Sequence, residues 1–266
     1  MMTKKDNLAA FEELLDIMDE LRTKCPWDKE QTFESLRKLT IEETYELGDA
    51  VLRKDVQGIK DELGDLMLHI VFYAKIGSEN HYFDIGSIIQ ALNKKLITRH
   101  PHIYGDIEVR NADDVKKNWE EIKLREGTKS VLEGVPKSLP ALVKANRIQE
   151  KVRGVGFDWE HKNDIWAKVD EELSEIKREL IKNQTNLNNN SQQEKIEAEF
   201  GDLFFTLINA ARLYKIDPEN ALERTNQKFI KRFTFLEDKA SELGKLLKDL
   251  SLDEMDKIWE EAKKFE

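Results

Sequence analysis

Cysteine, proline and glycine are scarce in this sequence. Cys25 is the single cysteine among 266 residues, so no disulfide can form within the chain, and a reducing, cytoplasmic setting is expected. Only 5 prolines and 12 glycines interrupt the chain, which predicts long helices. Residues 1–13 lack the apolar stretch of a signal peptide, and no run approaches the roughly 20 apolar residues of a membrane span. We therefore expect no membrane partner.

Positive charge is outnumbered by negative charge. The sequence has 43 Lys and Arg residues against 53 Asp and Glu, a net charge of −10. A non-specific nucleic-acid binder needs a basic surface to displace counterions, so no nucleic-acid partner is expected. An acidic protein can hold a polyphosphate only through bound metal or locally placed Lys and Arg. With 39% apolar residues, the chain is too apolar for disorder and long enough to bury a core.

Apolar residues recur with helical spacing, and strand-like alternation is nearly absent. Spacings of three and four connect a run near the N-terminus and another in the second half: Phe11, Leu14, Leu15, Met18 and Leu21, and Leu203, Leu207, Ala210 and Ala211. Residues 107–110 are the one weak strand candidate. These patterns predict an all-α protein built from small antiparallel bundles of about four helices.

The sequence contains an internal repeat. Four short blocks, rich either in acidic residues or in Lys, Arg and Trp, occur twice in the same order: 42–46 and 171–175, 62–66 and 199–203, 93–99 and 226–232, 119–123 and 259–263. Because chance does not produce four ordered matches, we interpret the chain as a duplicated module. Gly134, Pro136 and Pro140 break the helical pattern between the copies. The predicted modules are residues 1–127 and 141–266, joined by a linker at 128–140.

Acidic residues of the second module can meet on two neighbouring helices. Glu171, Glu172 and Glu175 share one helix face. Glu199 and Asp202, three residues apart, share a face of the next helix. Antiparallel pairing would bring up to five carboxylates together, where mutual repulsion raises their pKa values. Because Mg²⁺ prefers oxygen ligands and bridges to phosphate oxygens, the pattern predicts a Mg²⁺ site.

A solvated acidic face is the ordinary alternative, because Glu-rich helices are common without any ligand. Two features favour the metal site. Apolar residues within 200–205 surround the second acidic motif, and the whole pattern recurs in the first module. The matching acidic residues there are Glu42, Glu43, Glu46, Glu62 and Asp65.

Basic and aromatic residues follow the acidic motifs in both modules. Lys228 and Arg232 lie four residues apart, as do Trp259 and Lys263, so each pair shares a helix face. Lys and Arg bind phosphate oxygens that a metal ion leaves free. Trp259 could pack against a base, although a tryptophan in a helix is more often a core residue.

The order Glu-Glu-x-x-Glu, Glu-x-x-Asp, a Lys/Arg block and Trp-x-x-x-Lys resembles the MazG family of nucleoside triphosphate pyrophosphohydrolases. Residues 24–28 (Lys-Cys-Pro-Trp-Asp) and 99–102 (Arg-His-Pro-His) also resemble that family's first module. The resemblance covers nearly the whole chain. It implies an all-α fold related to dimeric dUTPases, usually a homodimer, and Mg²⁺-dependent cleavage of an NTP or dNTP to the monophosphate and pyrophosphate. Broad specificity and a part in nucleotide-pool house-cleaning or the stress response are expected.

The resemblance also implies roles for residues of the second module. The implied metal ligands are Glu172, Glu175, Glu199 and Asp202. The implied nucleotide contacts are Lys168, Lys195, Lys228, Arg232, Trp259 and Lys263. Water would attack the α-phosphorus, and either Glu171 or a ligand glutamate such as Glu172 or Glu175 would take its proton; the sequence does not choose between them.

The two modules differ at their cationic positions. The first module retains the basic and aromatic residues that follow the acidic motifs, namely Lys95, Arg99, Trp119 and Lys123. Leu39, however, aligns with Lys168, and Gly58 aligns with Lys195. Each charged hydrogen bond lost costs roughly 1.5–3 kcal/mol of binding. We therefore expect the second module to perform most of the hydrolysis, and the first to serve dimerisation, regulation or residual activity.

Three alternatives remain. The first, a di-iron carboxylate bundle, is disfavoured because it needs Glu-x-x-His on two helices, whereas both copies have Glu-x-x-Asp. His69 has no counterpart, since Thr206 takes its place, and we interpret it as a core histidine. A non-catalytic helical module would dock a basic partner on its acidic faces without needing Mg²⁺. The third alternative is a pyrophosphatase narrow for a modified nucleotide.

Overall fold

Helices form all the regular secondary structure of the described residues, which confirms the predicted all-α class. The computed structural model describes residues 2–111, 114–115, 118–119, 122, 130–184 and 190–265. The weak strand candidate at 107–110 forms no strand. None of the helices described here combines the length and the hydropathy that a membrane-crossing segment requires.

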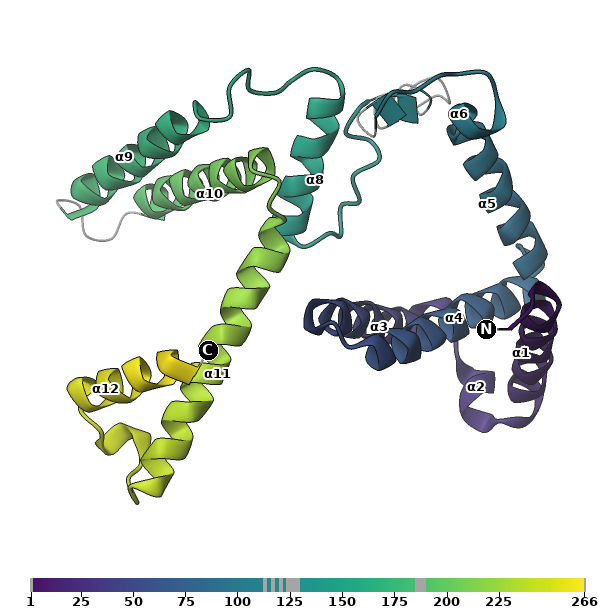
Figure 1. The fold of residues 1–266 in the computed structure, drawn as a ribbon, viewed down its shortest axis with the longest axis horizontal. Helices are drawn as coiled ribbons and strands as arrows, with labels where there is room; N and C mark the ends of the chain where they lie inside the picture. Colours follow the sequence, from purple (N-terminus) through teal and green to yellow (C-terminus); the bar gives the residue numbers. More distant parts are fainter. Residues whose placement is uncertain are drawn as a thin grey trace. The chain divides into compact units, whose positions relative to one another are not determined.

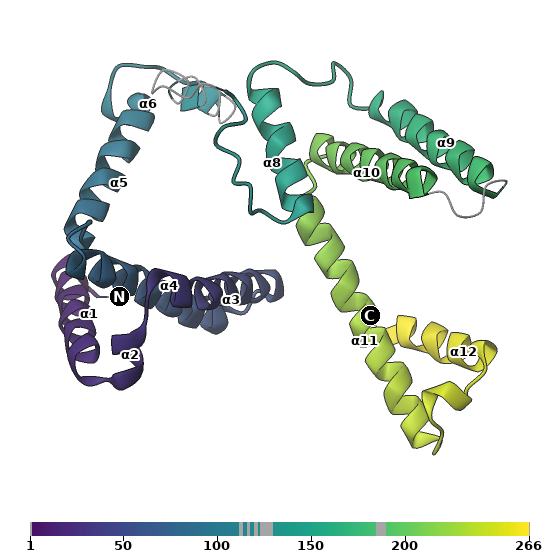
Figure 2. The same ribbon diagram turned by 180° about the vertical axis from the view of Figure 1, so that it is seen from behind.

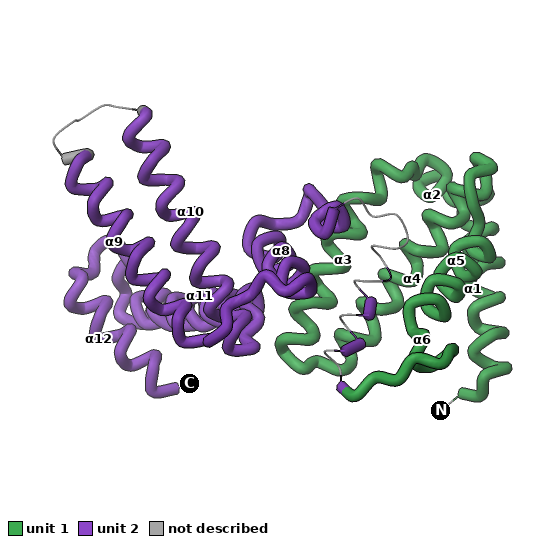
Figure 3. Tube along the Cα trace, turned by 90° about the horizontal axis from the view of Figure 1, so that it is seen from above, with its two compact units in different colours: residues 1–110 green, residues 111–266 purple. Residues whose placement is uncertain are grey.

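The chain divides into two compact units, Met1–Arg110 and Asn111–Glu266 (Figure 3). We refer to them as unit 1 and unit 2. The division falls after Arg110, ahead of the predicted linker at 128–140, so residues 130–140 belong to unit 2. There the main-chain oxygen of Val131 accepts a hydrogen bond of 3.0 Å from Nζ of the buried Lys151.

Unit 1 is built around a pair of long helices. Its elements are α1 (Lys4–Lys24), α2 (Pro26–Glu30), α3 (Phe33–Arg53), α4 (Val56–Glu79), α5 (Ile85–Arg99) and α6 (Pro101–Tyr104). Capping boxes begin α1, α3 and α5, where Thr3, Thr32 and Asp84 accept hydrogen bonds from amides of the first turn. Helices α3 and α4 lie side by side as an antiparallel hairpin (Figures 1 and 2).

The core of unit 1 lies at one end of this hairpin. Its buried side chains come from α1, α3 and α4: Met18, Leu36, Val71, Phe72 and Ile76. Leu36 is near the start of α3 and Val71 is in the second half of α4, so the core occupies the end away from the α3–α4 turn. The middle of the hairpin is left to the acidic motifs.

The turn between α3 and α4 is closely fitted. Lys54 ends α3 in the left-handed region at φ 57°. Asp55 caps α4, and its side chain accepts a hydrogen bond of 3.0 Å from the amide of Gly58. A Cβ atom at Gly58 would lie 2.7 Å from Oδ2 of Asp55 and 3.3 Å from Cβ of Ala50. A side chain at position 58 would therefore require the Asp55 carboxylate to shift.

Unit 2 repeats the hairpin. Its elements are α8 (Ala141–Gly154), α9 (Ile165–Gln184), α10 (Asn190–Leu213), α11 (Pro218–Glu242), α12 (Leu252–Ala262) and two 3₁₀ turns, Leu247–Asp249 and Lys263–Phe265. Helices α9 and α10 pair along their length and bury isoleucines from both helices, while α12 packs on α11 (Figures 1 and 2). Gln149 on α8 donates a hydrogen bond of 2.7 Å to the main-chain oxygen of Phe205 on α10.

Both hairpins expose an apolar stripe at equivalent positions. In α4 the stripe consists of Leu63, Met67 and Ile70, and in α10 of Phe200, Phe204 and Leu207. Each of these side chains belongs to a residue at least 39% exposed. The spacing of four and three residues places each set on one helix face. Such a face beside an acidic motif is a candidate surface for association.

Candidate metal and nucleotide site

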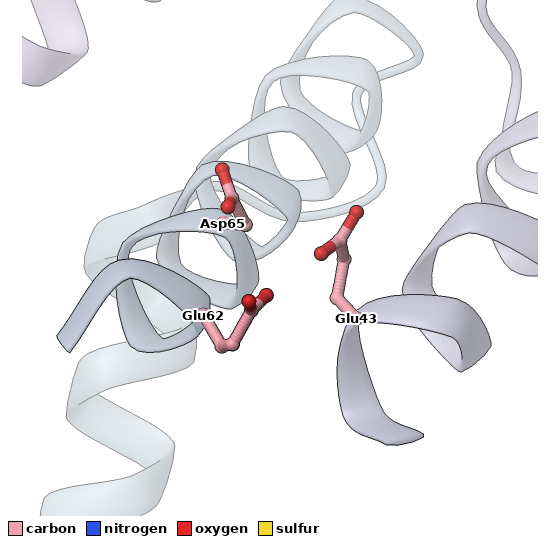
Figure 4. A group of neighbouring side chains, drawn as sticks. All are labelled: Glu43, Glu62 and Asp65. Atoms are coloured by element: carbon pink, nitrogen blue, oxygen red, sulfur yellow. The ribbon is translucent and has the colours of Figure 1, made fainter. Parts of the chain in front are cut away.

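In unit 1, the hairpin brings three carboxylates from the acidic motifs together. Glu43 on α3 faces Glu62 and Asp65 on α4 (Figure 4). Each offers an oxygen within 4.8 Å of those of the other two. The pKa of Glu43 is raised by burial, then by the nearby charges of Asp65 and Glu46. Burial and the charge of Glu46 likewise raise the pKa of Glu62.

The other acidic residues predicted for unit 1 lie outside this trio. Glu46 is exposed and acts on Glu43 and Glu62 only through its charge. Glu42 is also exposed and forms an ion pair of 3.4 Å with Lys38 on the solvent side of α3. Of the adjacent residues Glu42 and Glu43, Glu43 is therefore the one that joins the carboxylates of α4.

In unit 2, three of the four predicted metal ligands come together. Glu172 and Glu175 on α9 and Glu199 on α10 each offer an oxygen within 4.8 Å of those of the other two. We call Glu172, Glu175 and Glu199 the unit 2 trio. Glu172 is only 5% exposed. Asp202 is exposed and lies outside the trio, although its charge helps to raise the pKa of Glu199.

The pKa of Glu199 shows how crowded the unit 2 trio is. Burial raises this pKa most, followed by the charges of Glu175, Asp202 and Glu172. An excess of negative charge that raises a carboxyl pKa is relieved by a bound cation. The donors of both trios are carboxylate oxygens alone, with no His or Cys among them. This donor set fits a hard divalent cation such as Mg²⁺.

Lys168, a predicted phosphate contact, is paired with carboxylates of its own helix. Its Nζ lies 2.8 Å from Oε1 of Glu172 and 3.1 Å from Oε1 of Glu171. The hydrogen bonds to Glu172 and then to Glu171 raise the pKa of Lys168. Arg178 holds Glu175 in the same way, at 2.8 Å. Unit 2 therefore carries counter-cations beside its trio.

Glu179 is a neighbour of this site that the sequence analysis missed. It lies on α9 seven residues after Glu172 and accepts a hydrogen bond of 2.7 Å from Gln192 of α10, which ties the two helices together. Hydrogen bonds from Lys182 and Gln192 lower its pKa, and the predicted nucleotide contact Lys195 adds to this through its charge. Glu179 also helps to raise the pKa of Glu199. Spacing of three and seven residues along α9 was the signal that could have revealed it.

The remaining predicted nucleotide contacts of unit 2 gather on α11 and at the end of α12. The guanidinium carbon of Arg232 lies 5.7 Å from the ring centroid of Trp259, and the ring of Phe229 lies 5.1 Å from it. Lys263 forms an ion pair with Glu260, and Lys228 is exposed on α11. This group lies on α11 and at the end of α12, whereas the unit 2 trio lies on α9 and α10.

In unit 1, only part of the corresponding group falls on described residues. Lys95 and Arg99 lie on α5, and Trp119 is a half-buried helical residue. Lys123 lies outside the described residues. His69 is buried, with its Nδ1 2.7 Å from Oγ1 of Thr40, which confirms the prediction of a core histidine.

The fold and the two trios together define the class of protein. It is an all-α protein in which two helical hairpins each present a cluster of carboxylates. Residues 31–104 and 161–234, one segment in each unit, match the MazG nucleotide pyrophosphohydrolase domain. The chain belongs to the MazG family, as a tandem of two MazG domains, and the predicted family and tandem fold are confirmed.

Relatives along the full chain agree with this assignment. The nucleoside triphosphate pyrophosphohydrolase/pyrophosphatase MazG of Thermotoga maritima is 40% identical over 258 residues, 95% of each chain. The nucleoside triphosphate pyrophosphohydrolase of Escherichia coli K12 is 38% identical over 263 residues, 96% of this chain and 98% of that one. YabN of Bacillus subtilis, an uncharacterized protein, is 44% identical over 96% of this chain, which spans 52% of YabN.

Proposed function

We propose that this chain is a Mg²⁺-dependent nucleoside triphosphate pyrophosphohydrolase that cleaves an NTP or dNTP to the monophosphate and pyrophosphate. The observation that carries the proposal is the unit 2 trio, whose oxygens lie within 4.8 Å of one another in a MazG domain. The names of the full-length relatives support the same reaction. Such an enzyme, with broad specificity, suits the removal of unwanted nucleotides from the cellular pool.

The proposed mechanism divides the work among the residues of unit 2. Glu172, Glu175 and Glu199 would hold Mg²⁺, and Asp202 would add negative charge beside Glu199. The ion lowers the pKa of water and offsets negative charge on the phosphates when bound. Glu171 or a glutamate of the trio would accept the proton of the attacking water. Lys228, Arg232 and Lys263 would bind phosphate oxygens, and Trp259 would pack on the base.

Product analysis tests the reaction directly. The full chain is incubated with common and modified NTPs and dNTPs, with Mg²⁺ or with EDTA, and the products are separated by ion-exchange chromatography. We expect monophosphate and pyrophosphate with Mg²⁺ and no turnover in EDTA, because carboxylates alone cannot neutralise a triphosphate. Diphosphate and orthophosphate would contradict attack at the α-phosphorus. Absence of turnover with every nucleotide would favour a non-catalytic helical module.

We also propose that the enzyme is a homodimer in which the hairpins of two copies cover each other's apolar stripes. The stripes recur at equivalent positions in both units, and Phe200 directly follows Glu199 of the trio. A two-helix hairpin buries only one face of each helix, so a second hairpin would complete a four-helix bundle. The partner copy would then cover the flank of the carboxylate site.

A charge placed in a stripe should separate the copies. We expect wild type to sediment as a dimer in analytical ultracentrifugation, and Phe204→Glu to shift it toward monomer at micromolar concentration, because an unpaired carboxylate would be buried at the interface. Leu252→Glu is the matched control, since Leu252 is 78% exposed and begins α12, where an acidic residue is favourable. A monomeric wild type would refute the dimer.

A further inference from the structure

Lys168 reaches the most buried carboxylate of the site. It lies on α9 one turn before Glu172, and its Nζ is 2.8 Å from Oε1 of that residue. The Glu172 side chain is 6% exposed, whereas that of Lys168 is 37% exposed. The lysine therefore lies at the surface of the site, with its ammonium directed to the buried carboxylate of Glu172.

This ion pair and a bound metal would use the same carboxylate. Glu172 belongs to the trio whose oxygens converge within 4.8 Å. An ammonium in contact with the Glu172 carboxylate would lie within a few ångströms of a divalent ion in the trio, and like charges at that separation repel strongly in a partly buried site. A metal ion and the Lys168 ammonium therefore compete for Glu172.

We propose that Lys168 is an internal counter-ion for Glu172 in the metal-free chain, and that entry of a divalent cation releases its ammonium to bind the phosphates of the nucleotide. The inference rests on the proposed function, because it assigns the metal to the unit 2 trio. The proposal couples metal binding to nucleotide binding, because the lysine that the metal displaces becomes available to the triphosphate. It also lessens the cost of keeping a buried carboxylate charged before the metal binds.

The repeat offers an internal comparison. The position of Lys168 is occupied in unit 1 by Leu39, which packs against the core of that unit. Glu43, the counterpart of Glu172, forms no ion pair with any residue the structure describes, and burial and neighbouring carboxylates raise its pKa. The pairing of a lysine with the central glutamate is thus a feature of unit 2 alone.

Metal binding without nucleotide tests the competition. The experiment uses the full chain with Glu62→Gln, a substitution that weakens the unit 1 trio. Mn²⁺ replaces Mg²⁺ as the probe, and the concentration of free Mn²⁺ is measured by electron paramagnetic resonance. In this background we expect Lys168→Met to lower the Kd for Mn²⁺ about tenfold, the equivalent of one charge-assisted hydrogen bond, and to raise the KM for the nucleotide. Lys177→Met removes the same charge from an exposed position of α9 and should change neither quantity more than about twofold.

The outcomes separate this inference from the proposed function. If the parent hydrolyses NTP but Lys168→Met and Lys177→Met bind Mn²⁺ equally, the counter-ion role is wrong and the proposed function stands. Tighter Mn²⁺ binding with an unchanged KM would overturn the transfer of Lys168 to the nucleotide. A Glu172→Gln variant that binds Mn²⁺ as the parent does would show that the trio is not the metal site and would overturn this inference, whereas the proposed function fails only if the parent hydrolyses no nucleotide to monophosphate and pyrophosphate.

Discussion

Replacing Glu172 by Gln should lower kcat for nucleotide hydrolysis by about a thousandfold, since a bound metal supplies several kcal/mol of stabilisation and each 1.36 kcal/mol is a factor of ten. Glu172 is the most buried member of the unit 2 trio, at 5% exposure, and its oxygen faces those of Glu175 and Glu199. A neutral amide keeps the shape of the side chain but is a poor metal ligand. Release of pyrophosphate at saturating Mg²⁺ measures the effect.

The control for this variant lies two positions earlier on the same helix. Asp170→Asn also removes one negative charge from α9, but Asp170 is exposed and outside the trio. We expect it to retain activity within about twofold, because solvent screens an exposed charge. The thermal unfolding of both variants, followed by circular dichroism, shows whether the fold is retained. Equal activity of Glu172→Gln and Asp170→Asn would remove the trio from the mechanism.

Helical spacing predicted the trios, but only partly. A period of 3.6 residues fixes which glutamates share a face, and pairing of consecutive helices brings two such faces together. Spacing could not decide between Glu171 and Glu172, because adjacent residues are about 100° apart and the rotation of the helix depends on its apolar contacts. The burial of Ile165 and Ile176 turns Glu172 inward and leaves Glu171 exposed.

Other features of the site depend on contacts that spacing does not specify. Lys168 precedes Glu172 by four residues, a spacing that predicts an ion pair as readily as a phosphate contact. Glu179 follows the helical spacing of Glu172 and Glu175, but its hydrogen bond to Gln192 across the hairpin could not be read from spacing. The residues of α11 and α12 that are predicted to contact the nucleotide could be recognised from the sequence by their chemistry. Their position relative to the trio depends on tertiary packing, so the sequence could not predict it.

The largest contrast between equivalent variants should come from Glu199→Gln and Glu62→Gln. These glutamates occupy the same place in the repeated hairpin, each on the second helix of its hairpin and each in a trio. We expect Glu199→Gln to lose about 99% of the hydrolysis, and Glu62→Gln to keep most of it. Each variant changes one carboxylate to an amide, so the comparison is matched in charge and volume.

The expected contrast follows from what unit 1 can place around its trio. A cation at position 39 would have to leave the core against which Leu39 packs. A cation at position 58 would require the Asp55 carboxylate to shift, because a Cβ atom there would lie 2.7 Å from Oδ2 of Asp55. Unit 1 thus lacks two positive charges that unit 2 carries, and a triphosphate bound there would lose roughly 1.5–3 kcal/mol for each missing charged hydrogen bond.

Steady-state kcat and KM for both variants, with dimer content checked by ultracentrifugation, measure the contrast. Retained dimer with lost hydrolysis in Glu199→Gln would assign turnover to unit 2. Selective loss in Glu62→Gln, with Glu199→Gln active, would reverse the assignment and make unit 1 the hydrolytic site. Equal partial losses would mean that both units turn over nucleotide, and that the missing cations of unit 1 are supplied by residues other than those at positions 39 and 58.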